Sequence, residues 1–267
     1  MKELTLQELK EIELEILKVF DAFCKENNIR YYLSHGTLLG AIRYKKFIPW
    51  DDDVDLLIPR EDYNRMLSLF KDTDRYKLFA FEKDPKYRFP IAKLCDMTTL
   101  KDEVGYDNGV TLGVDIDLFP LDAWDDDIEK ARQEVKYIKK NMFRLGLTKL
   151  KKPDSVNPVK RFVKGIVMIF CKMLGSKYYI KNIIKASSKE WTPEAKYLGC
   201  KAWCVYGEKG IIPAEVFAET VDIEFEGQTF PAPADWDKYL TCLYGDYLPE
   251  PPKEKQKTHH GFKAYKL

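Results

Sequence analysis

Short apolar stretches alternate with helical patterns through the first 120 residues, and this alternation limits the possible folds more than any other feature. Strand character is found in residues 29–34, 54–58, 76–81, 89–95 and 113–119. Helical spacing is found in residues 6–27, 36–44 and 61–70, the first of them preceded by a capping box at Thr5 and Glu8. Such alternation predicts an α/β (α+β) core with a largely buried sheet flanked by helices.

The character of the chain changes after residue 123, so we expect three parts. Residues 1–123 form the predicted catalytic core. Residues 124–203 are predicted to be a mainly helical, basic subdomain, beginning with a helix over Asp125–Leu145. Residues 204–267, with a short strand at Val221–Phe225 and a last helix at Asp235–Leu243, are expected to pack back on the core.

Two carboxylates, Asp53 and Asp55, are separated by the apolar Val54. On a strand both would project from one face while Val54 points into the core. Their mutual repulsion is costly unless a divalent cation lies between them. The segment Val114–Phe119 again alternates acidic and apolar residues, and Asp117 is the expected third ligand. We therefore predict that Asp53, Asp55 and Asp117 are catalytic and bind Mg²⁺, as two ions, with Mn²⁺ as the alternative metal.

A glycine-bearing turn lies just before these acids, in the segment Ser34–Gly40. Gly36 and Thr37 can present backbone N–H groups and a hydroxyl to phosphate oxygens at the start of a helix. Arg43, just past the turn, and Lys93, on an apolar strand, are the predicted cationic contacts to a phosphorylated substrate. The alternatives are a surface arginine for Arg43 and a snorkelling lysine for Lys93.

Composition excludes several other classes of protein. Lys and Arg (44) nearly cancel Asp and Glu (43), so the net charge indicates no particular partner. No apolar run approaches the length of a membrane span or a signal peptide, which predicts a cytoplasmic protein.

The six cysteines are expected to be reduced. Zinc bound by Cys200 and Cys204 together with His259 or His260 is a minor alternative, because no CxxC spacing is present. The Pro-rich tail before these histidines either folds over the site or is an exposed terminus.

The middle of the chain is strongly basic. Between Lys149 and Lys189 the one acidic residue is Asp154, and lysines alternate with apolar residues at helical spacing. This pattern suits peripheral contact with an anionic membrane, or an acceptor rich in phosphate. A helical subdomain with its apolar stripe turned inward is the alternative. No nucleic-acid recognition module is visible, so nucleic acid is not an expected partner.

The motifs around the acids resemble the LicD family, a branch of the polymerase-β-like nucleotidyltransferase superfamily. The resemblance lies in His35–Arg43, Phe47–Asp55 and Ile116–Asp122, and it resumes near the C-terminus at Phe225–Gly227 and Tyr244–Tyr247. It implies a nucleotidyltransferase-type core with a mixed sheet. It also implies that Asp53 and Asp55 are the paired metal ligands and that Asp117 is the third carboxylate, which can accept the proton of an attacking hydroxyl.

The same resemblance implies cytidine diphosphocholine (CDP-choline) as the donor. The expected acceptor is a sugar hydroxyl on a phosphate-bearing, lipid-linked surface glycan such as a teichoic acid precursor, and CMP is the leaving group. Choline is recognised by aromatic faces, and the candidates are Tyr87, Tyr106, Trp203, Tyr206, Trp236, Tyr244 and Tyr247. The alternative reactions are nucleotidyl transfer and transfer of another polyol phosphate. The non-enzymatic alternative is a scaffold that binds choline or glycan.

Overall fold

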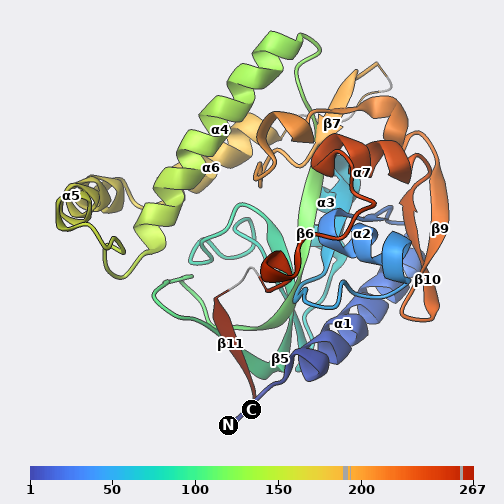
Figure 1. Ribbon diagram of the computed structural model, residues 1–267, viewed down its shortest axis with the longest axis horizontal. Coiled ribbons are helices and arrows are strands. Elements are labelled where there is room, and N and C mark those ends of the chain that lie inside the picture. The colour runs from blue at the N-terminus through green and yellow to red at the C-terminus, as the bar shows by residue number, and fades with distance from the viewer. Residues whose placement is uncertain (189–191, 193, 259–260) are drawn as a thin grey trace.

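The computed structural model describes residues 1–188, 192, 194–258 and 261–267. Lys189, His259 and His260 lie outside these residues. The centre of the molecule is a mixed sheet whose main strand order is β1-β11-β5-β6-β3-β2 (Figure 1). The α/β class predicted from the alternation of strands and helices is therefore confirmed.

The strands of this sheet come from every part of the chain. Their bounds are β1 Lys2–Glu3, β2 Tyr32–Leu33, β3 Asp55–Pro59, β4 Tyr76–Phe79, β5 Ala92–Glu103, β6 Leu112–Ala123, β7 Tyr197–Gly199, β8 Ile212–Pro213 and β11 Phe262–Lys266. Strand β4 pairs with β5, and β7 pairs with both β6 and β8. The pair β3–β6 is parallel, whereas β6 runs antiparallel to β5. The acidic segment that precedes β3 therefore ends beside the acidic segment of the central strand β6.

Three helices of the N-terminal part surround this sheet. They are α1 Leu6–Glu26, α2 His35–Tyr44 and α3 Arg60–Leu69. Helix α1 begins with the predicted capping box, in which Thr5 Oγ1 accepts a hydrogen bond from the Glu8 backbone and the Glu8 carboxylate accepts one from the Thr5 backbone. It packs against β5 and β6, while α2 and α3 pack against β3.

Three further helices form an arm that extends from the sheet (Figure 1). They are α4 Ile128–Lys149, α5 Pro158–Leu174 and α6 Ser176–Ser187. Helix α4 packs against both α5 and α6, and α5 lies at the end of the arm. No helix among the described residues is both long and apolar enough to cross a membrane.

The C-terminal part returns to the core at three places. The hairpin of β9 Thr220–Phe225 and β10 Gln228–Pro233 contacts α2 and β2, and α7 Trp236–Tyr244 contacts α2. Strand β11 pairs with β5 and with β1, so both termini lie at one edge of the sheet (Figure 1). Three short 3-10 helices complete this part, η1 Gly207–Gly210, η2 Ala214–Phe217 and η3 Lys253–Lys255.

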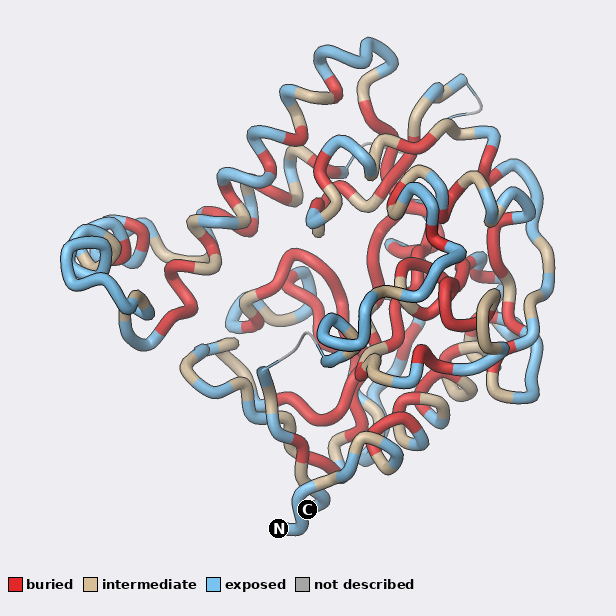
Figure 2. Tube along the Cα trace, viewed as in Figure 1, coloured by how far each residue is buried: buried red, intermediate tan, exposed pale blue. Residues whose placement is uncertain are grey.

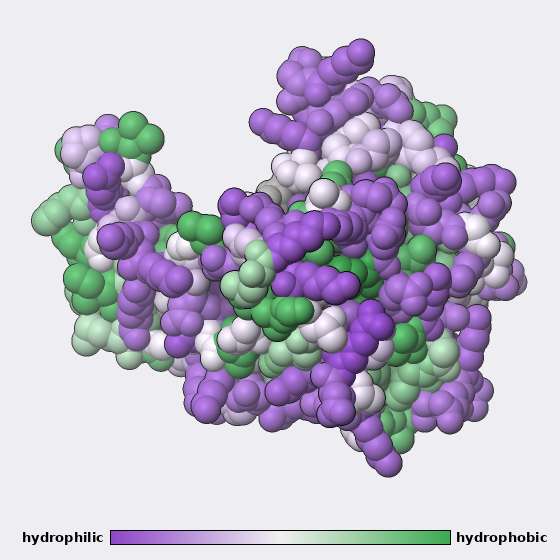
Figure 3. Space-filling model, turned by 90° about the horizontal axis from the view of Figure 1, so that it is seen from below, coloured by the Kyte–Doolittle hydropathy of each residue, from purple (hydrophilic) through white to green (hydrophobic). Residues whose placement is uncertain are grey.

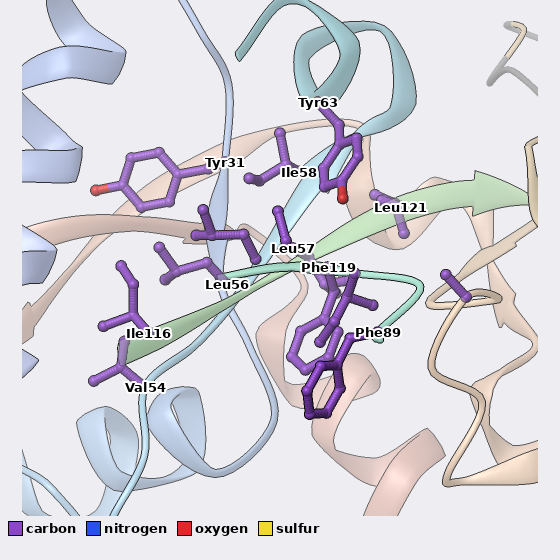
Figure 4. Close-up of a cluster of buried hydrophobic side chains, with 14 of the residues drawn as sticks. Tyr31, Val54, Leu56, Leu57, Ile58, Tyr63, Phe89, Ile116, Phe119 and Leu121 are labelled. Carbon is purple, nitrogen blue, oxygen red and sulfur yellow. The ribbon is translucent and has the colours of Figure 1, made fainter. Parts of the chain in front are cut away.

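The hydrophobic core fills both sides of β3 and β6. Figure 2 shows these strands as buried along their length, and Figure 4 shows Val54, Leu56 and Ile116 on one side of the crossing strands, with Phe119 and Phe89 near the other. Leu56, Ile116 and Leu118 have no measurable exposure. Continuous burial on both faces is typical of central strands in α/β folds.

Several predicted boundaries differ from the structure. The strand predicted over residues 29–34 is reduced to Tyr32–Leu33, because Asn28 adopts a left-handed conformation (φ 51°) and Ile29 N–H still bonds Cys24 O at the end of α1. Strand β3 begins at Asp55, so the prediction that Asp53 lies on this strand is wrong. The pattern also left β1, β7, β8, β10 and β11 unrecognised, since these strands are short or pair over long range.

Candidate active site

Asp55 and Asp117 lie opposite each other at the start of the parallel pairing of β3 and β6. They are register partners, and the Asp117 N–H donates a 2.8 Å hydrogen bond to the carbonyl of Val54. Asp55 is buried and Asp117 is half-buried. The strand arrangement therefore places two predicted catalytic carboxylates on neighbouring internal strands, at the start of β3.

A second group of carboxylates precedes β3. Among the described residues, one ligand oxygen from each of Asp51, Asp52 and Asp53 lies within 4.8 Å of the others, and this cluster shares Asp53 with the predicted triad. Gly36 makes the arrangement possible, because a Cβ at that position would lie 2.6 Å from Asp51 Oδ2. The Asp51 carboxylate consequently lies against the first turn of α2, where backbone N–H groups and the helix dipole favour negative charge.

The start of α2 is fixed to β3 by hydrogen bonds. Thr37 Oγ1 accepts a 2.8 Å hydrogen bond from the Asp55 backbone N–H, and Ser34 N–H donates to the Asp55 carbonyl at 3.0 Å. Thr37 is buried. Its hydroxyl, which was predicted to contact phosphate, thus orders the backbone of Asp55, a predicted catalytic residue.

Lysines beneath the site compensate part of its negative charge. Lys93 Nζ donates to Asp115 Oδ1 at 2.8 Å and forms a second ion pair with Asp117. Lys101 Nζ lies 3.1 Å from Asp115 Oδ2. Burial lowers the pKa of Lys93, but the two carboxylates outweigh this and hold its pKa well above the ordinary value. Lys93 therefore stays charged and orients Asp117.

Two acids near the start of β3 have raised pKa values. Burial, followed by the charges of Asp53, Asp117 and Asp51, raises the pKa of Asp55 well above its ordinary value. Burial and the charge of Asp53 likewise raise the pKa of Glu13, on α1, and its Oε2 has no hydrogen-bond partner. A cation bound near these acids would relieve both effects.

A cavity of about 650 Å³ opens beside these residues. It is bounded by the start of α2 at Gly36, by Arg43, and by the acids Asp51, Asp53, Asp55 and Asp117. Arg43 Nη2 also donates a 2.8 Å hydrogen bond to the Pro249 carbonyl, and Tyr44 OH donates to Glu250 at 2.6 Å. The Pro-rich tail, in its described part, thus folds over this first cavity.

Aromatic side chains line the opposite wall of the first cavity. His35 stacks on Tyr206 with ring centroids 5.3 Å apart, and the hydroxyls of Tyr206 and Tyr244 are 2.7 Å apart. Burial lowers the pKa of His35 to about 4, so its ring is neutral at pH 7. Of the predicted choline contacts, Trp203, Tyr206, Tyr244 and Tyr247 line this cavity. Tyr87, Tyr106 and Trp236 do not, and Tyr106 lines a second cavity.

A second cavity of about 570 Å³ meets the first at two of the predicted catalytic acids. Asp53, Asp117 and Trp203 line both cavities. The remaining lining of the second cavity includes apolar residues, the acids Glu103 and Asp115, and four basic residues, Arg88, Lys93, Lys101 and Lys149. Burial lowers the pKa of Lys149 to about 7, and its ammonium lies 3.1 Å from the centroid of the Phe89 ring. The second cavity therefore offers cations and an aromatic face to an anionic ligand.

Several residues of this site were missed by sequence reasoning. Asp115 alternates with Asp117 on β6, and the period of two already placed both on one face. Glu13, Lys101 and Lys149 carry no such signal, because they come from α1, the end of β5 and the end of α4, and meet the acids through long-range packing. Cys200 and Cys204, the minor zinc alternative, are free thiols.

Comparison with known proteins gives matches over this same region and beyond it. Residues 28–153 match the family described as LicD/FKTN/FKRP, nucleotidyltransferase domain. The chain is 32% identical over 272 aligned positions to the lipopolysaccharide cholinephosphotransferase LicD of Haemophilus influenzae, covering 100% of both chains. It is also 37% identical over 75 residues to an uncharacterized protein of Rickettsia typhi, which covers 27% of this chain and 24% of that one. A segment of 57 residues, 21% of this chain and 11% of the other, is 44% identical to the human ribitol 5-phosphate transferase FKRP.

Proposed function

Because this chain belongs to the LicD family, we propose that it is a transferase that moves phosphocholine from CDP-choline to a sugar hydroxyl of a bacterial surface glycan. The relative from Haemophilus influenzae, similar along the whole chain, is named for cholinephosphate transfer to lipopolysaccharide. For this chain the proposed acceptor is a phosphate-bearing, lipid-linked glycan such as a teichoic acid precursor. The proposed location is the cytoplasm, at the inner face of the membrane.

One observation carries the proposal: Asp53 and Asp117 lie where two cavities of similar size meet. Group transfer needs a donor and an acceptor whose reacting atoms approach each other next to the groups that stabilise charge. A binding scaffold needs one pocket and has no use for converging buried acids. The paired cavities therefore favour a reaction between two substrates.

The first cavity is the proposed donor site. The start of α2 at Gly36 and the guanidinium of Arg43 suit the diphosphate of CDP-choline. The aromatic wall offers faces to the quaternary ammonium of choline, which cannot donate a hydrogen bond. This combination of phosphate and aromatic contacts is what a choline-bearing nucleotide requires.

The carboxylates near the start of β3 are suitable ligands for Mg²⁺. Their ligand atoms are carboxylate oxygens alone, with Asp51, Asp52 and Asp53 clustered and Asp55 beside Asp117, and hard divalent cations prefer such oxygens together with phosphate. Asp53, Asp55 and Asp117 are the proposed ligands, and Asp51 and Asp52 add negative charge. When bound, the metal neutralises the charge that develops on the phosphate oxygens.

The chain's own residues position the reaction. The acceptor hydroxyl oxygen forms a bond to the β-phosphorus, and the bond from that phosphorus to the bridging oxygen breaks, with its electron pair leaving on CMP. The hydroxyl proton passes to the carboxylate of Asp117. The ion pair with Lys93 orients this carboxylate, so we propose that Lys93 positions Asp117. A direct contact between Lys93 and phosphate stays a prediction.

The second cavity is the proposed acceptor site. Arg88, Lys101 and Lys149 suit the phosphate groups of the glycan, and the ring of Phe89 suits the apolar face of a sugar. Because this cavity shares Asp53 and Asp117 with the first, an acceptor bound here presents its hydroxyl to the donor phosphate. The opposite assignment of the two cavities would place the choline cation beside the basic side chains of Arg88 and Lys149.

The test is CMP release from CDP-choline by the full chain, with Mg²⁺ and a phosphate-bearing amino-sugar acceptor. Lipopolysaccharide and teichoic acid fragments are compared as acceptors, and Asp53→Asn is the matched inactive variant. CMP release that requires acceptor, metal and Asp53 supports the proposal. Pyrophosphate release from CTP would instead establish nucleotidyl transfer, and transfer from CDP-ribitol would establish another polyol phosphate. Binding of CDP-choline with no turnover on either acceptor would favour a scaffold.

A further inference from the structure

Helix α5 turns its apolar side away from the protein. Nine large apolar side chains of this helix are exposed, and the six most exposed are Val159, Phe162, Ile169, Phe170, Met173 and Leu174, each with at least 57% of its surface accessible. On the other side of the helix, Met168 and Cys171 are buried against the arm. This is the reverse of a surface helix in a soluble domain, whose apolar side faces the core.

The exposed side of α5 is continuous and free of polar groups. At about 100° per residue, the nine exposed apolar residues fall within an arc of roughly 160°. No polar or charged side chain of α5 falls in that arc. Lys160, Arg161, Lys164 and Lys172 fall on the remaining arc, beside the buried contacts. Figure 3 shows apolar residues gathered on the lobe that holds this helix, at the left of the view.

The charge around α5 has one sign. Lys151 and Lys152 precede the helix, and Lys177, Lys181 and Lys185 on α6 are exposed next to it. The one acid between residues 149 and 188 is Asp154, which is paired with Lys164. A patch of apolar residues bordered by cations complements a surface that is hydrocarbon below and anionic above.

A protein partner fits these observations less well. Protein interfaces carry hydrogen bonds about every 100–200 Å² and polar groups at their rim, whereas the exposed arc of α5 offers no side-chain donor or acceptor. Its nine residues are aliphatic and aromatic side chains, which make no directional contact that would fix the register of a protein partner. Insertion of apolar side chains among acyl chains requires neither hydrogen bonds nor a fixed alignment with a partner.

We propose that α5 is a membrane-docking helix that lies in the plane of an anionic bilayer, with its apolar arc among the acyl chains and its lysines and arginine at the headgroups. This inference rests on the proposed location at the membrane and assigns it to one helix, but it is independent of the proposed reaction because docking needs no catalytic residue. It gives a physical reason for a lipid-linked acceptor: α4, which ends at Lys149 in the second cavity, packs against the docked helix.

The test is flotation of the full chain with vesicles of phosphatidylglycerol and phosphatidylcholine, beside vesicles of phosphatidylcholine alone. The test variant combines Phe162→Ser, Phe170→Ser and Met173→Ser. The matched control combines Tyr137→Ser and Phe143→Ser, two exposed aromatics of α4. Wild type and control are expected to float with the anionic vesicles, and the α5 variant at least tenfold less. Neutral vesicles are expected to bind wild type at least tenfold more weakly.

Three results would overturn the proposal. They are an α5 variant that floats like wild type, a wild type that ignores anionic vesicles, and a wild type that dimerises through α5 in sedimentation without binding lipid. Melting temperatures equal to wild type show that the variants are folded. CMP release with a water-soluble acceptor is expected to be unchanged in the α5 variant, so a failure of docking is distinguishable from a failure of the proposed function.

Discussion

Asp55 and Asp117 are register partners on neighbouring parallel strands, and both carboxylates lie at the edge where the two cavities meet. The backbones of neighbouring strands are about 4.8 Å apart, so the two side chains start close together. Burial, followed by the charges of Asp53 and Asp117, raises the pKa of Asp55. The sheet brings them together through backbone hydrogen bonds, at a cost in stability that a bound cation removes. Their relationship therefore ties the stability of the fold to its proposed metal.

The first prediction concerns removal of one of these charges. Asp55→Asn is expected to raise the melting temperature in the presence of a chelator, because the neutral amide ends the repulsion. The same variant should lose the stabilisation that Mg²⁺ gives to wild type and at least about a hundredfold in CMP release. Thermal unfolding with and without Mg²⁺ checks this. Asp126→Asn, on the exposed turn before α4, is the control, and equal Mg²⁺ stabilisation in both variants would contradict the assignment.

The second prediction concerns the hydrogen bond from the Asp55 N–H to Thr37 Oγ1. Thr37→Val keeps the shape of the side chain but leaves a buried N–H unpaired, so the free energy of unfolding should fall by about 1–3 kcal/mol. Thr37→Ser keeps the oxygen and should lose less. Urea unfolding of the three proteins gives the order. Valine keeps the Thr37 methyl and serine lacks it, so a valine variant that is destabilised no more than the serine variant would show that the hydrogen bond contributes less than the packing of this methyl.

The pairing of Asp55 with Asp117 shows what the sequence can and cannot reveal. Alternation of acidic and apolar residues with a period of two predicted that the segments at residues 54–58 and 113–119 are strands carrying acids. It could not predict that the two strands are parallel neighbours, because strand pairing depends on contacts more than 50 residues apart. Lys101 was missed for the same reason: the register of β5 shifts between Asp96 and Lys101, which local periodicity does not encode.

Helix α5 shows the same limit on a larger scale. Its spacing of apolar and basic residues predicted an amphipathic helix, and the structure has that helix at Pro158–Leu174. Which side of the helix faces outward depends on how it packs against α4 and α6. The alternative prediction, in which the apolar stripe packs inward, is wrong for α5. Strand β11 was missed because these five residues, which follow a Pro-rich tail, become a strand through long-range pairing with β5 and β1.

The third prediction concerns pH and Lys149. Burial lowers its pKa from an ordinary value near 10.5 to about 7, so the free protein carries a neutral amine above pH 7. An anionic ligand in the second cavity favours the charged form, and binding above pH 7 must then take up a proton. Affinity should weaken by up to about tenfold per pH unit above 7. Titration calorimetry between pH 6 and pH 9 measures this with a sugar phosphodiester, whose own charge is constant over that range.

The matched variants for this titration are Lys149→Met and Lys149→Arg. The methionine removes the titrating group and should give weak binding that does not change with pH. The arginine stays charged over the whole range, so its binding should be strong and equally flat. A wild type whose affinity is unchanged from pH 6 to pH 9 would show that Lys149 does not contact the ligand.

The fourth prediction concerns the aromatic residue shared by the two cavities. Trp203 lines both of them beside Asp53 and Asp117, which is where the transferred phosphocholine must lie in the proposed reaction. An indole face attracts a quaternary ammonium by about 0.5–2 kcal/mol, so Trp203→Leu should raise KM for CDP-choline by roughly threefold to thirtyfold. Trp203→Phe should recover part of the loss. CDP-ribitol has no cation and serves as the control ligand: if its binding falls as much as that of CDP-choline, Trp203 acts through packing against Phe89 rather than through choline.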